Sequence, residues 1–156
     1  TPQELSIYEI HIRDFTIHES WQSNVGNANG TYNAFVESGT KVTVDNKTVS
    51  TGYDHLNELG VKAIQLLPVF DHDNNEEWTD GKPADFNWGY NPLNYNCVEG
   101  QYSSDPEDGL ARIKEYKNLG EQFGVYTEFE HLALNDKGRI ISLGNPFDIY
   151  EFEYKG

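Results

Sequence analysis

The sequence predicts an α/β fold, in which helices connect parallel strands. Two observations carry this prediction: a β-rich segment near the N-terminus, Leu5–Phe15, and a helix followed at once by a strand over residues 51–69. A strand, a helix and a second strand along the chain form a βα pattern, whose strands run parallel with a right-handed crossover. With 156 residues, 37% of them hydrophobic, the chain can form one domain or a piece of a larger one.

The first predicted strand covers Leu5–Phe15, "LSIYEIHIRDF". Period-two alternation places its side chains on two faces: Ile7, Glu9, His11 and Arg13 on one, and Tyr8, Ile10, Ile12 and Asp14 on the other. A parallel sheet builds its sites at the C-terminal ends of its strands, where His11–Asp14 collect. Either His11 contacts a substrate there with Asp14 or Arg13, or it makes hydrogen bonds within the fold. The second is the commoner role.

Residues 16–51 are polar and rich in Asn, Gly and Thr, which predicts a long excursion with a short helix at Tyr32–Gly39. A helix then begins at Thr51 or Gly52 and ends at Gly60, with an apolar face formed by Tyr53, Leu56 and Leu59. The strand Val61–Val69 follows directly, and it is apolar enough to be covered on both faces.

A second long loop, Asp71–Pro106, contains "DFNWGYNPLNYN" at Asp85–Asn96, which carries four aromatic residues. The next helix has Asp105 as its expected N-cap, with Glu107 and Asp108 in its first turn. Its expected buried face consists of Leu110, Ile113, Tyr116, Lys117 and Phe123. Residues 124–156 then predict a β-rich tail: a strand, a turn at 135–139, a second strand, and the alternating segment Phe147–Tyr154.

Charge and composition exclude several classes of function. A net charge of −15, from 11 basic and 26 acidic residues, opposes binding to nucleic acid and to anionic membrane surfaces. Runs of 18 apolar residues are missing, which argues against a membrane-spanning helix. Cys97 is the single cysteine, so an intramolecular disulfide and a cysteine metal cluster are both excluded.

Three blocks of this sequence resemble type I pullulanases, debranching enzymes of the α-amylase superfamily, glycoside hydrolase family thirteen. The blocks are "YEIHIRDF", "GYDHLNELGVKAIQLLPVF" and "NWGYNPLNYNCVEGQYSSDPEDGLARIKEYK", which run in order from Tyr8 to Lys117. The hexapeptide "NWGYNP", Asn87–Pro92, is the most specific piece. The resemblance implies a partial (β/α)8 TIM barrel over residues 5–123, its first βα units, with residues 124–156 as an unplaced β-rich tail.

The resemblance also implies a function: hydrolysis of α-1,6-glucosidic links in pullulan, starch or glycogen-derived dextrins. One face of a glucose ring stacks on an aromatic plane, while its hydroxyls hydrogen-bond to amides. In that family Tyr90 would stack under the glucose at the cleavage point, and Trp88 and Asn91 would help to shape the same loop. The alternative is that Trp88 and Tyr95 pack the loop onto the barrel. An α-glucan partner follows, and a secreted or cell-surface bacterial location is slightly favoured over others.

The chain departs from the family after the second helix. The family continues with a segment like Asp-Val-Val-Tyr-Asn-His, whereas this chain has "GVYTEFEHLALNDKGR". The nucleophilic Asp, the general-acid Glu and the third carboxylate have no counterpart, so no catalytic residue is assigned. Glu128, Glu130 and His131 could form a metal or acid–base group, but two solvent-facing sides of a sheet are the ordinary interpretation.

Two hypotheses of different class therefore remain. The chain is a pullulanase-type enzyme represented by a partial catalytic domain, inactive alone and completed by the remainder of the barrel. Alternatively, it is a non-catalytic α-glucan-binding or structural remnant. The chain is truncated, or residues between its pieces are missing, or its tail is a remodelled ending. We also expect the tail strand Phe147–Tyr154 either to pair with the βα core or to leave the chain needing a partner.

No cofactor is predicted, with one alternative. Asp71, Asp73 and Asn75 occupy the first three positions of a calcium loop, but Glu76 stands where Gly is needed and Lys82 where Glu is needed. An irregular calcium site and a solvated acidic loop are both compatible with this pattern, and the second fits the departures better.

Overall fold

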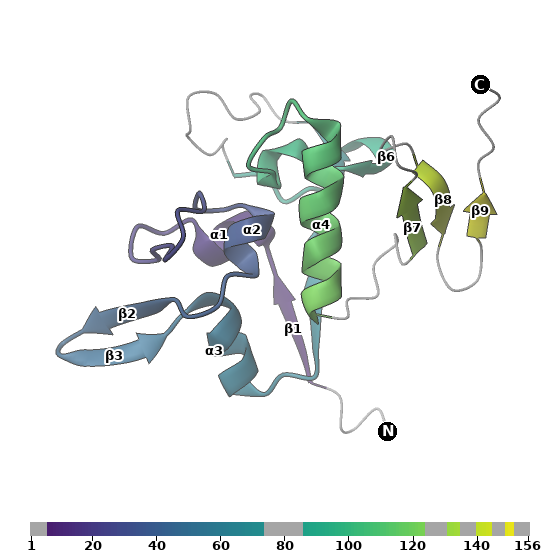
Figure 1. Ribbon diagram of the computed structural model, residues 1–156. Helices are drawn as coiled ribbons and strands as arrows, with labels where there is room; N and C mark the ends of the chain where they lie inside the picture. The colour runs from purple at the N-terminus through teal and green to yellow at the C-terminus, as the bar shows by residue number, and fades with distance from the viewer. Residues whose placement is uncertain (1–5, 74–85, 124–130, 135–139, 145–148, 152–156) are drawn as a thin grey trace.

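The computed structural model describes residues 6–73, 86–123, 131–134, 140–144 and 149–151. Helices and strands are mixed along the chain in the order β1, α1, α2, β2, β3, α3, β4, β5, β6, η2, α4, β7, β8, β9. The strands form four small sheets that are not hydrogen-bonded to one another among the described residues. Figure 1 shows the longest helix, α4, near the centre, with α1 and α2 close to it and the strands of the sheets around them.

The predicted parallel strand pair is present. Strand β1, Ile7–Ile10, pairs in parallel with β4, Ala63–Leu66, in a register that runs from Ile7 opposite Ala63 to Ile10 opposite Leu66. Both strands are shorter than the sequence predicts. The predicted cover on both faces of Val61–Val69 is incomplete, because Gln65 in β4 is exposed and the other three residues of β4 are only half-buried. In β1, Ile7 is 57% exposed.

The first strand ends earlier than the alternation predicts. The helix α1, Ile12–Thr16, begins directly after His11, whose backbone is extended at φ −97° and ψ 130°. The imidazole Nδ1 accepts the backbone N–H of Asp14 at 3.3 Å. The N–H groups of a first helical turn have no partner within the helix, so a side-chain acceptor at this position favours helix over strand. The prediction of a strand over residues 11–15 is therefore wrong.

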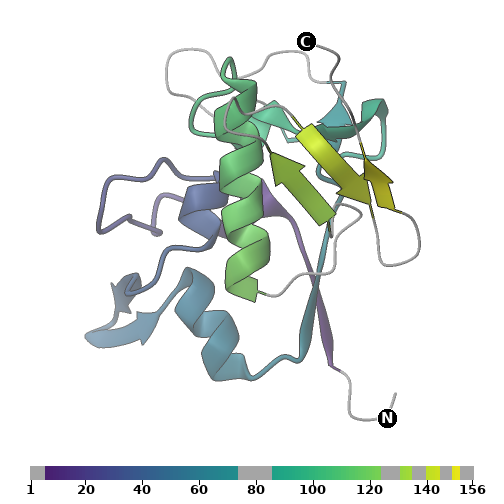
Figure 2. The same cartoon turned by 45° about the vertical axis from the view of Figure 1, so that its right-hand side comes forward.

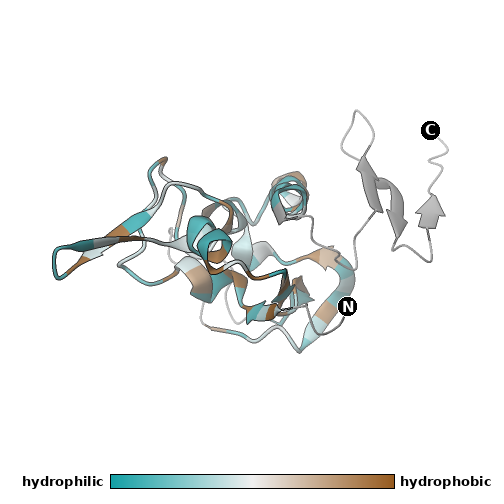
Figure 3. Ribbon diagram, turned by 90° about the horizontal axis from the view of Figure 1, so that it is seen from below, coloured by the Kyte–Doolittle hydropathy of each residue, from teal (hydrophilic) through white to brown (hydrophobic). Residues whose placement is uncertain are grey.

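The excursion over residues 16–51 contains a hairpin that was not predicted. Strand β2, Lys41–Val44, pairs antiparallel with β3, Lys47–Ser50. The two residues between them, Asp45 and Asn46, have φ values of 50° and 61°. Positive φ at both central residues matches the two-residue hairpin turn that Asn and Asp favour. The hairpin projects from the rest of the chain, and its ribbon carries both apolar and polar segments (Figure 3).

Two short helices agree with the sequence prediction. Helix α2, Tyr32–Phe35, begins where predicted, with the Thr31 hydroxyl accepting the Ala34 N–H at 3.2 Å, but it is shorter than Tyr32–Gly39. Helix α3, Gly52–Leu59, has the predicted bounds, and Gly60 ends it with a φ of 68°. Of the predicted apolar face of α3, Leu56 is buried, whereas Leu59 is exposed.

The second long loop contains regular structure as well. Strand β5, Phe70–His72, pairs antiparallel with β6, Pro92–Val98, with register shifts on both sides of Asp71. A 3₁₀ helix, η2, follows at Gly100–Tyr102. The prediction of one long loop from Asp71 to Pro106 is therefore wrong in part, and the last five residues of the aromatic stretch Asp85–Asn96 lie on β6.

Helix α4, Gly109–Phe123, begins later than predicted. The Asp108 carboxylate accepts the Leu110 N–H at 2.9 Å and its carbonyl accepts the Arg112 N–H at 3.1 Å, so Asp108 caps the helix instead of Asp105. Lys117 was expected on the buried face, but it is exposed, with its ammonium 3.8 Å from the Glu121 carboxylate. Leu119, which was not predicted, is fully buried in its place.

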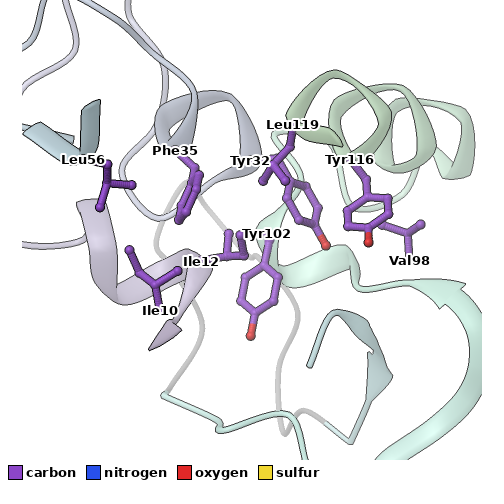
Figure 4. Close-up of a cluster of buried hydrophobic side chains, with 9 residues drawn as sticks. All are labelled: Ile10, Ile12, Tyr32, Phe35, Leu56, Val98, Tyr102, Tyr116 and Leu119. Carbon is purple, nitrogen blue, oxygen red and sulfur yellow. The ribbon is translucent and has the colours of Figure 1, made fainter. Parts of the chain in front are cut away.

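The core lies where α2 meets its neighbours. Helix α2 contacts α1, α3 and α4, and Figure 2 shows it beside α4 from a second direction. The ring of Tyr32 meets the rings of Tyr102 and Tyr116 edge to face, and its centroid lies 5.7 Å from each of theirs. The cluster is drawn in Figure 4 and consists of Ile10, Ile12, Tyr32, Phe35, Leu56, Val98, Tyr102, Tyr116 and Leu119.

The described part of the tail forms a separate antiparallel sheet. It contains β7, His131–Leu134, β8, Ile140–Gly144, and β9, Ile149–Glu151, in the order β7-β8-β9. The expected tail strand thus pairs with β8, and no pairing with β1 or β4 occurs among the described residues. Among all the residues that the structure describes, no helix is both long enough and apolar enough to cross a membrane.

Candidate functional site

The aromatic loop, defined here as Phe86–Asn91, is closed by hydrogen bonds to a single residue. The carbonyl oxygen of Asp73 accepts the side-chain N–H groups of Asn87, at 2.8 Å, and of Asn91, at 3.1 Å. The Asp73 N–H also donates to the Asn91 carbonyl at 3.1 Å. Both ends of the Asn87–Asn91 segment are therefore attached to the residue that follows β5.

A tight turn lies at the centre of the aromatic loop. Gly89 has a φ of 85°, and a Cβ added to it would lie 2.8 Å from the Pro68 carbonyl oxygen. The Gly89 N–H donates to the side-chain oxygen of Asn87 at 2.9 Å. Glycine is required here both by its positive φ and by this close approach, and the turn leaves Trp88 and Tyr90 on either side of it.

The two predicted aromatic site residues face solvent. Tyr90 is 66% exposed and Trp88 60% exposed, although large rings are usually buried. The Trp88 ring meets the Phe86 ring edge to face, with centroids 5.5 Å apart. The structure therefore places Tyr90 and Trp88 on one loop with accessible ring surface, while Asn91 uses its amide N–H to close that loop.

His11 supports the aromatic loop from the inside. Its Nε2 lies 2.8 Å from the Asn87 carbonyl oxygen and 3.2 Å from the Tyr102 hydroxyl. The rings of His11 and Phe86 are 5.2 Å apart. The residue is 7% exposed, and burial lowers the pKa of the imidazole because the charged form loses its hydration. Of the two roles left open for His11, the structure shows hydrogen bonds within the fold.

A buried carboxylate lies next to this group. Both oxygens of Glu99 accept backbone N–H groups, from Gln101 at 2.6 Å and from His72 at 2.9 Å. The Nδ1 of His72 is 3.1 Å from Glu99 and 3.0 Å from the Phe70 carbonyl, which places a proton on Nδ1. Burial raises the pKa of Glu99 and also that of Tyr102. Sequence analysis missed Glu99, because nothing local distinguishes it from the other glutamates.

Comparison with known proteins identifies the relatives of this chain. No family model matches it. Pullulanase from Bacillus subtilis (strain 168) is 42% identical over 120 residues, which is 76% of this chain and 15% of that protein. Pullulanase A from Streptococcus pneumoniae (serotype 2 strain D39 / NCTC 7466) is 37% identical over 127 residues, 76% of this chain and 9% of that protein.

A solved structure agrees with these relatives. The crystal structure of pullulanase from Paenibacillus barengoltzii, in complex with maltohexaose and α-cyclodextrin, superposes with a TM-score of 0.67 at 38% identity, covering 78% of this chain and 18% of that one. Over the matched segment, this chain is of the pullulanase type. The chain spans less than a fifth of the length of these pullulanases.

The buried acids in the described part of the pullulanase-type segment are engaged in hydrogen bonds. Its buried carboxylates, Glu37, Glu99 and Glu115, all accept hydrogen bonds from neighbouring N–H or O–H groups. Such carboxylates are occupied in holding the fold. Glu128 and Glu130 lie outside the described residues, so their role stays a prediction.

The calcium alternative rests largely on residues that are not described. Asn75, Glu76 and Lys82 lie outside the described residues. Within them, the Asp71 carboxylate accepts the Asn94 side-chain N–H at 2.6 Å and lies 3.9 Å from Arg112. No group of three or more His, Cys, Asp or Glu that could hold a metal ion occurs in the described part of the chain.

Proposed function

We propose that this chain supplies the glucose-contacting aromatic loop of an α-glucan debranching hydrolase that cleaves α-1,6 links. The observation that carries the proposal is the pair of solvent-facing rings, Tyr90 and Trp88, on a loop closed by Asn87 and Asn91. The relatives support it, since pullulanases match over 76% of this chain. Solved pullulanases hold maltooligosaccharides, as in the complexes with maltohexaose and with maltotriose.

The chemistry of the loop suits a neutral sugar. The C–H face of glucose stacks on an aromatic plane, and a loop fixed beforehand loses little conformational entropy on binding. Tyr90 is the stacking ring in this proposal, while Trp88 and Asn91 shape the loop beside it. A net charge of −15 does not oppose a neutral ligand.

We also propose that β1 and β4 are the first two strands of a (β/α)8 barrel over residues 5–123. They run parallel with α3 before β4, which is the order of a βα unit. The exposed side chain of Ile7 supports this placement, because further βα units would cover such a residue. The remainder of the barrel is then the partner that completes the sheet.

Replacing Tyr90 by alanine is expected to weaken binding of maltotriose by at least about tenfold, or about 1.4 kcal/mol. The aromatic plane is lost while the loop hydrogen bonds remain. Tyr90→Phe keeps the plane and should stay within about threefold of the wild type. Isothermal titration calorimetry or chemical-shift titration measures the affinity.

Tyr95→Ala is the matched control for this experiment. Tyr95 is 70% exposed on β6, and its ring meets Phe70 at 5.6 Å. An equal loss of affinity in Tyr90→Ala and Tyr95→Ala would show that general apolar surface, not the loop, binds the sugar. Unchanged affinity in Tyr90→Ala would contradict the proposal.

A second candidate function is α-glucan binding without hydrolysis. It is favoured by the occupied buried carboxylates described above. We expect the 156-residue chain to release no reducing ends from pullulan, because a glycosyl-enzyme intermediate needs two accessible carboxyls about 5–5.5 Å apart. Turnover that disappears in Glu128→Gln or Glu130→Gln would contradict this expectation and support an enzyme complete within the chain.

A further inference from the structure

The imidazole of His11 joins the aromatic loop to the start of helix α1. Its Nδ1 accepts the Asp14 N–H at 3.3 Å, and its Nε2 lies 2.8 Å from the Asn87 carbonyl oxygen. The Tyr102 hydroxyl lies 3.2 Å from the same Nε2. Because Asn87 also bonds to Asp73 and Gly89, a displacement of its carbonyl would move the segment that carries Trp88 and Tyr90.

These contacts determine the protonation state of the ring. A backbone N–H can only donate, so Nδ1 must be an unprotonated acceptor. The Asn87 carbonyl can only accept, so Nε2 must carry the proton. His11 is therefore neutral, with a single hydrogen that it donates to the loop.

We propose that His11 is a positioning residue that holds the aromatic loop in its glucan-contacting place only while its imidazole is neutral. That His11 holds the aromatic loop follows only from the hydrogen bonds of its imidazole. The consequence for carbohydrate rests on the function proposed above.

Protonation of His11 opposes both of its contacts. A hydrogen on Nδ1 would point at the Asp14 N–H, and the acceptor that keeps α1 capped would be lost. The Asp14 carboxylate lies 4.0 Å from Nδ1 and can accept the new hydrogen once the ring turns toward it. Turning carries Nε2 away from the Asn87 carbonyl. A buried imidazolium also favours any opening that admits water.

The groups around His11 set the direction of the effect of pH. Burial lowers the pKa of His11 from its usual 6.5, and Arg13 and His72 act in the same direction, while the Asn87 bond and Asp14 oppose them. Arg13 is itself paired with Asp14 at 2.8 Å, and the Tyr102 ring contacts the rings of both His11 and His72. The transition therefore lies below pH 6.5.

The free energy of unfolding also decreases as the pH falls. Well above pH 6.5, His11 is neutral in both the folded and the unfolded chain, and it contributes no pH dependence. As the pH falls below 6.5, the unfolded chain takes up a proton first, so the free energy of unfolding decreases until the pKa of the folded state is passed.

Nitrogen-15 NMR of the full 156-residue chain tests the proposal. The indole N–H of Trp88, assigned by its loss in Trp88→Phe, is followed from pH 8 to pH 5 together with the imidazole nitrogens of His11. We expect the two to shift with one midpoint below pH 6.5, while the signal of the buried Trp21 shows that the fold is intact. A Trp88 signal that stays constant while His11 titrates would overturn the proposal.

Two variants separate the roles of the ring nitrogens. His11→Gln places an amide donor near the position of Nε2 but does not titrate, so the Trp88 signal should lose this transition and stay near its neutral position. His11→Asn keeps a cap for α1 but cannot reach Asn87, so the signal should hold its acid position at every pH. Persistence of the transition in His11→Gln would assign it to another group and overturn the proposal. The wild-type titration decides the matter even if a variant does not fold.

Maltotriose affinity gives the functional arm of the test. One pH unit below the His11 midpoint, about a tenth of the molecules keep a held loop, so the apparent dissociation constant should rise about tenfold over its value at pH 7.5. It should not rise in His11→Gln, and a rise of the same size there would overturn the link to His11. If maltotriose binds at no pH, the proposed function fails, while the Trp88 titration still decides the role of His11.

Discussion

Replacing Tyr32 by alanine is expected to lower the free energy of unfolding by about 3–5 kcal/mol. Tyr32 is fully buried, its ring meets those of Tyr102 and Tyr116, and it comes from the helix that contacts α1, α3 and α4. Removal of the ring leaves a cavity between elements that cannot all move inward. Because small domains have total stabilities of about 5–15 kcal/mol, the loss is severe.

Tyr32→Phe is the matched control, because it keeps the ring and removes only the hydroxyl. That hydroxyl donates to the Glu99 carbonyl at 3.3 Å, so the expected loss is about 0.5–1.5 kcal/mol. Urea denaturation, followed by circular dichroism, measures both variants. Equal losses in the two would show that the hydrogen bond, and not the ring packing, dominates at this position.

Replacing Glu99 by alanine is expected to cost about 3–5 kcal/mol as well. The side chain is fully buried, and its two oxygens accept the N–H groups of Gln101 and His72. Each buried N–H left without an acceptor costs about 1–3 kcal/mol. The change also removes the carboxylate that lies against His72 Nδ1, at the end of β5.

Glu99→Gln is the control that preserves shape. Its amide oxygen can serve one of the two N–H groups, but its NH₂ group faces the other, so the expected loss is about 1–3 kcal/mol. Ser104→Ala, at an exposed position, removes one hydroxyl donor from Glu115 and tests whether buried carboxylates in general are this sensitive. A Glu99→Ala variant as stable as the wild type would show that water replaces the carboxylate.

Local signals in the sequence predicted the helices best. Helix α3 was predicted with its bounds, because Gly60 provides the left-handed residue that ends it. Asp105 was a reasonable cap for α4, but Asp108 stands one residue before the observed start, and two acids three residues apart cannot be distinguished by composition. Lys117 was predicted on the buried face in place of Leu119, because the apolar residues of α4 do not form a continuous stripe.

The strands show the limits of period two. Alternation continues through Ile10 and Ile12, yet the strand ends at Ile10 because the His11 side chain caps a helix, which a hydropathy pattern does not record. The hairpin at 41–50 had its signal in the pair Asp45 and Asn46, which separates two short segments rich in Val and Thr, and this signal was overlooked within a polar region.

The candidate site was predictable in part for a physical reason. Tyr90 and Trp88 are close in the sequence, and a turn rich in Gly and Asn usually lies at the surface, where its side chains are accessible. Their sugar contact stays a prediction. The hydrogen bonds by which His11 supports the aromatic loop were not predictable. His11 lies 76 positions before Asn87 and 91 positions before Tyr102 in the sequence. A single sequence without the fold does not indicate such pairs.

The composition of the core has a consequence for how the chain is synthesised. Its nine members extend from Ile10 to Leu119, and the Tyr32 hydroxyl bonds to a residue 67 positions later. At about 5–20 residues per second, a ribosome needs about 3–13 s to make that interval. Throughout that time the rings of α2 are present without the tyrosines of η2 and α4 that cover them. The core around Tyr32 is therefore completed only after Leu119 has been translated, and apolar ring surface is exposed to association until then.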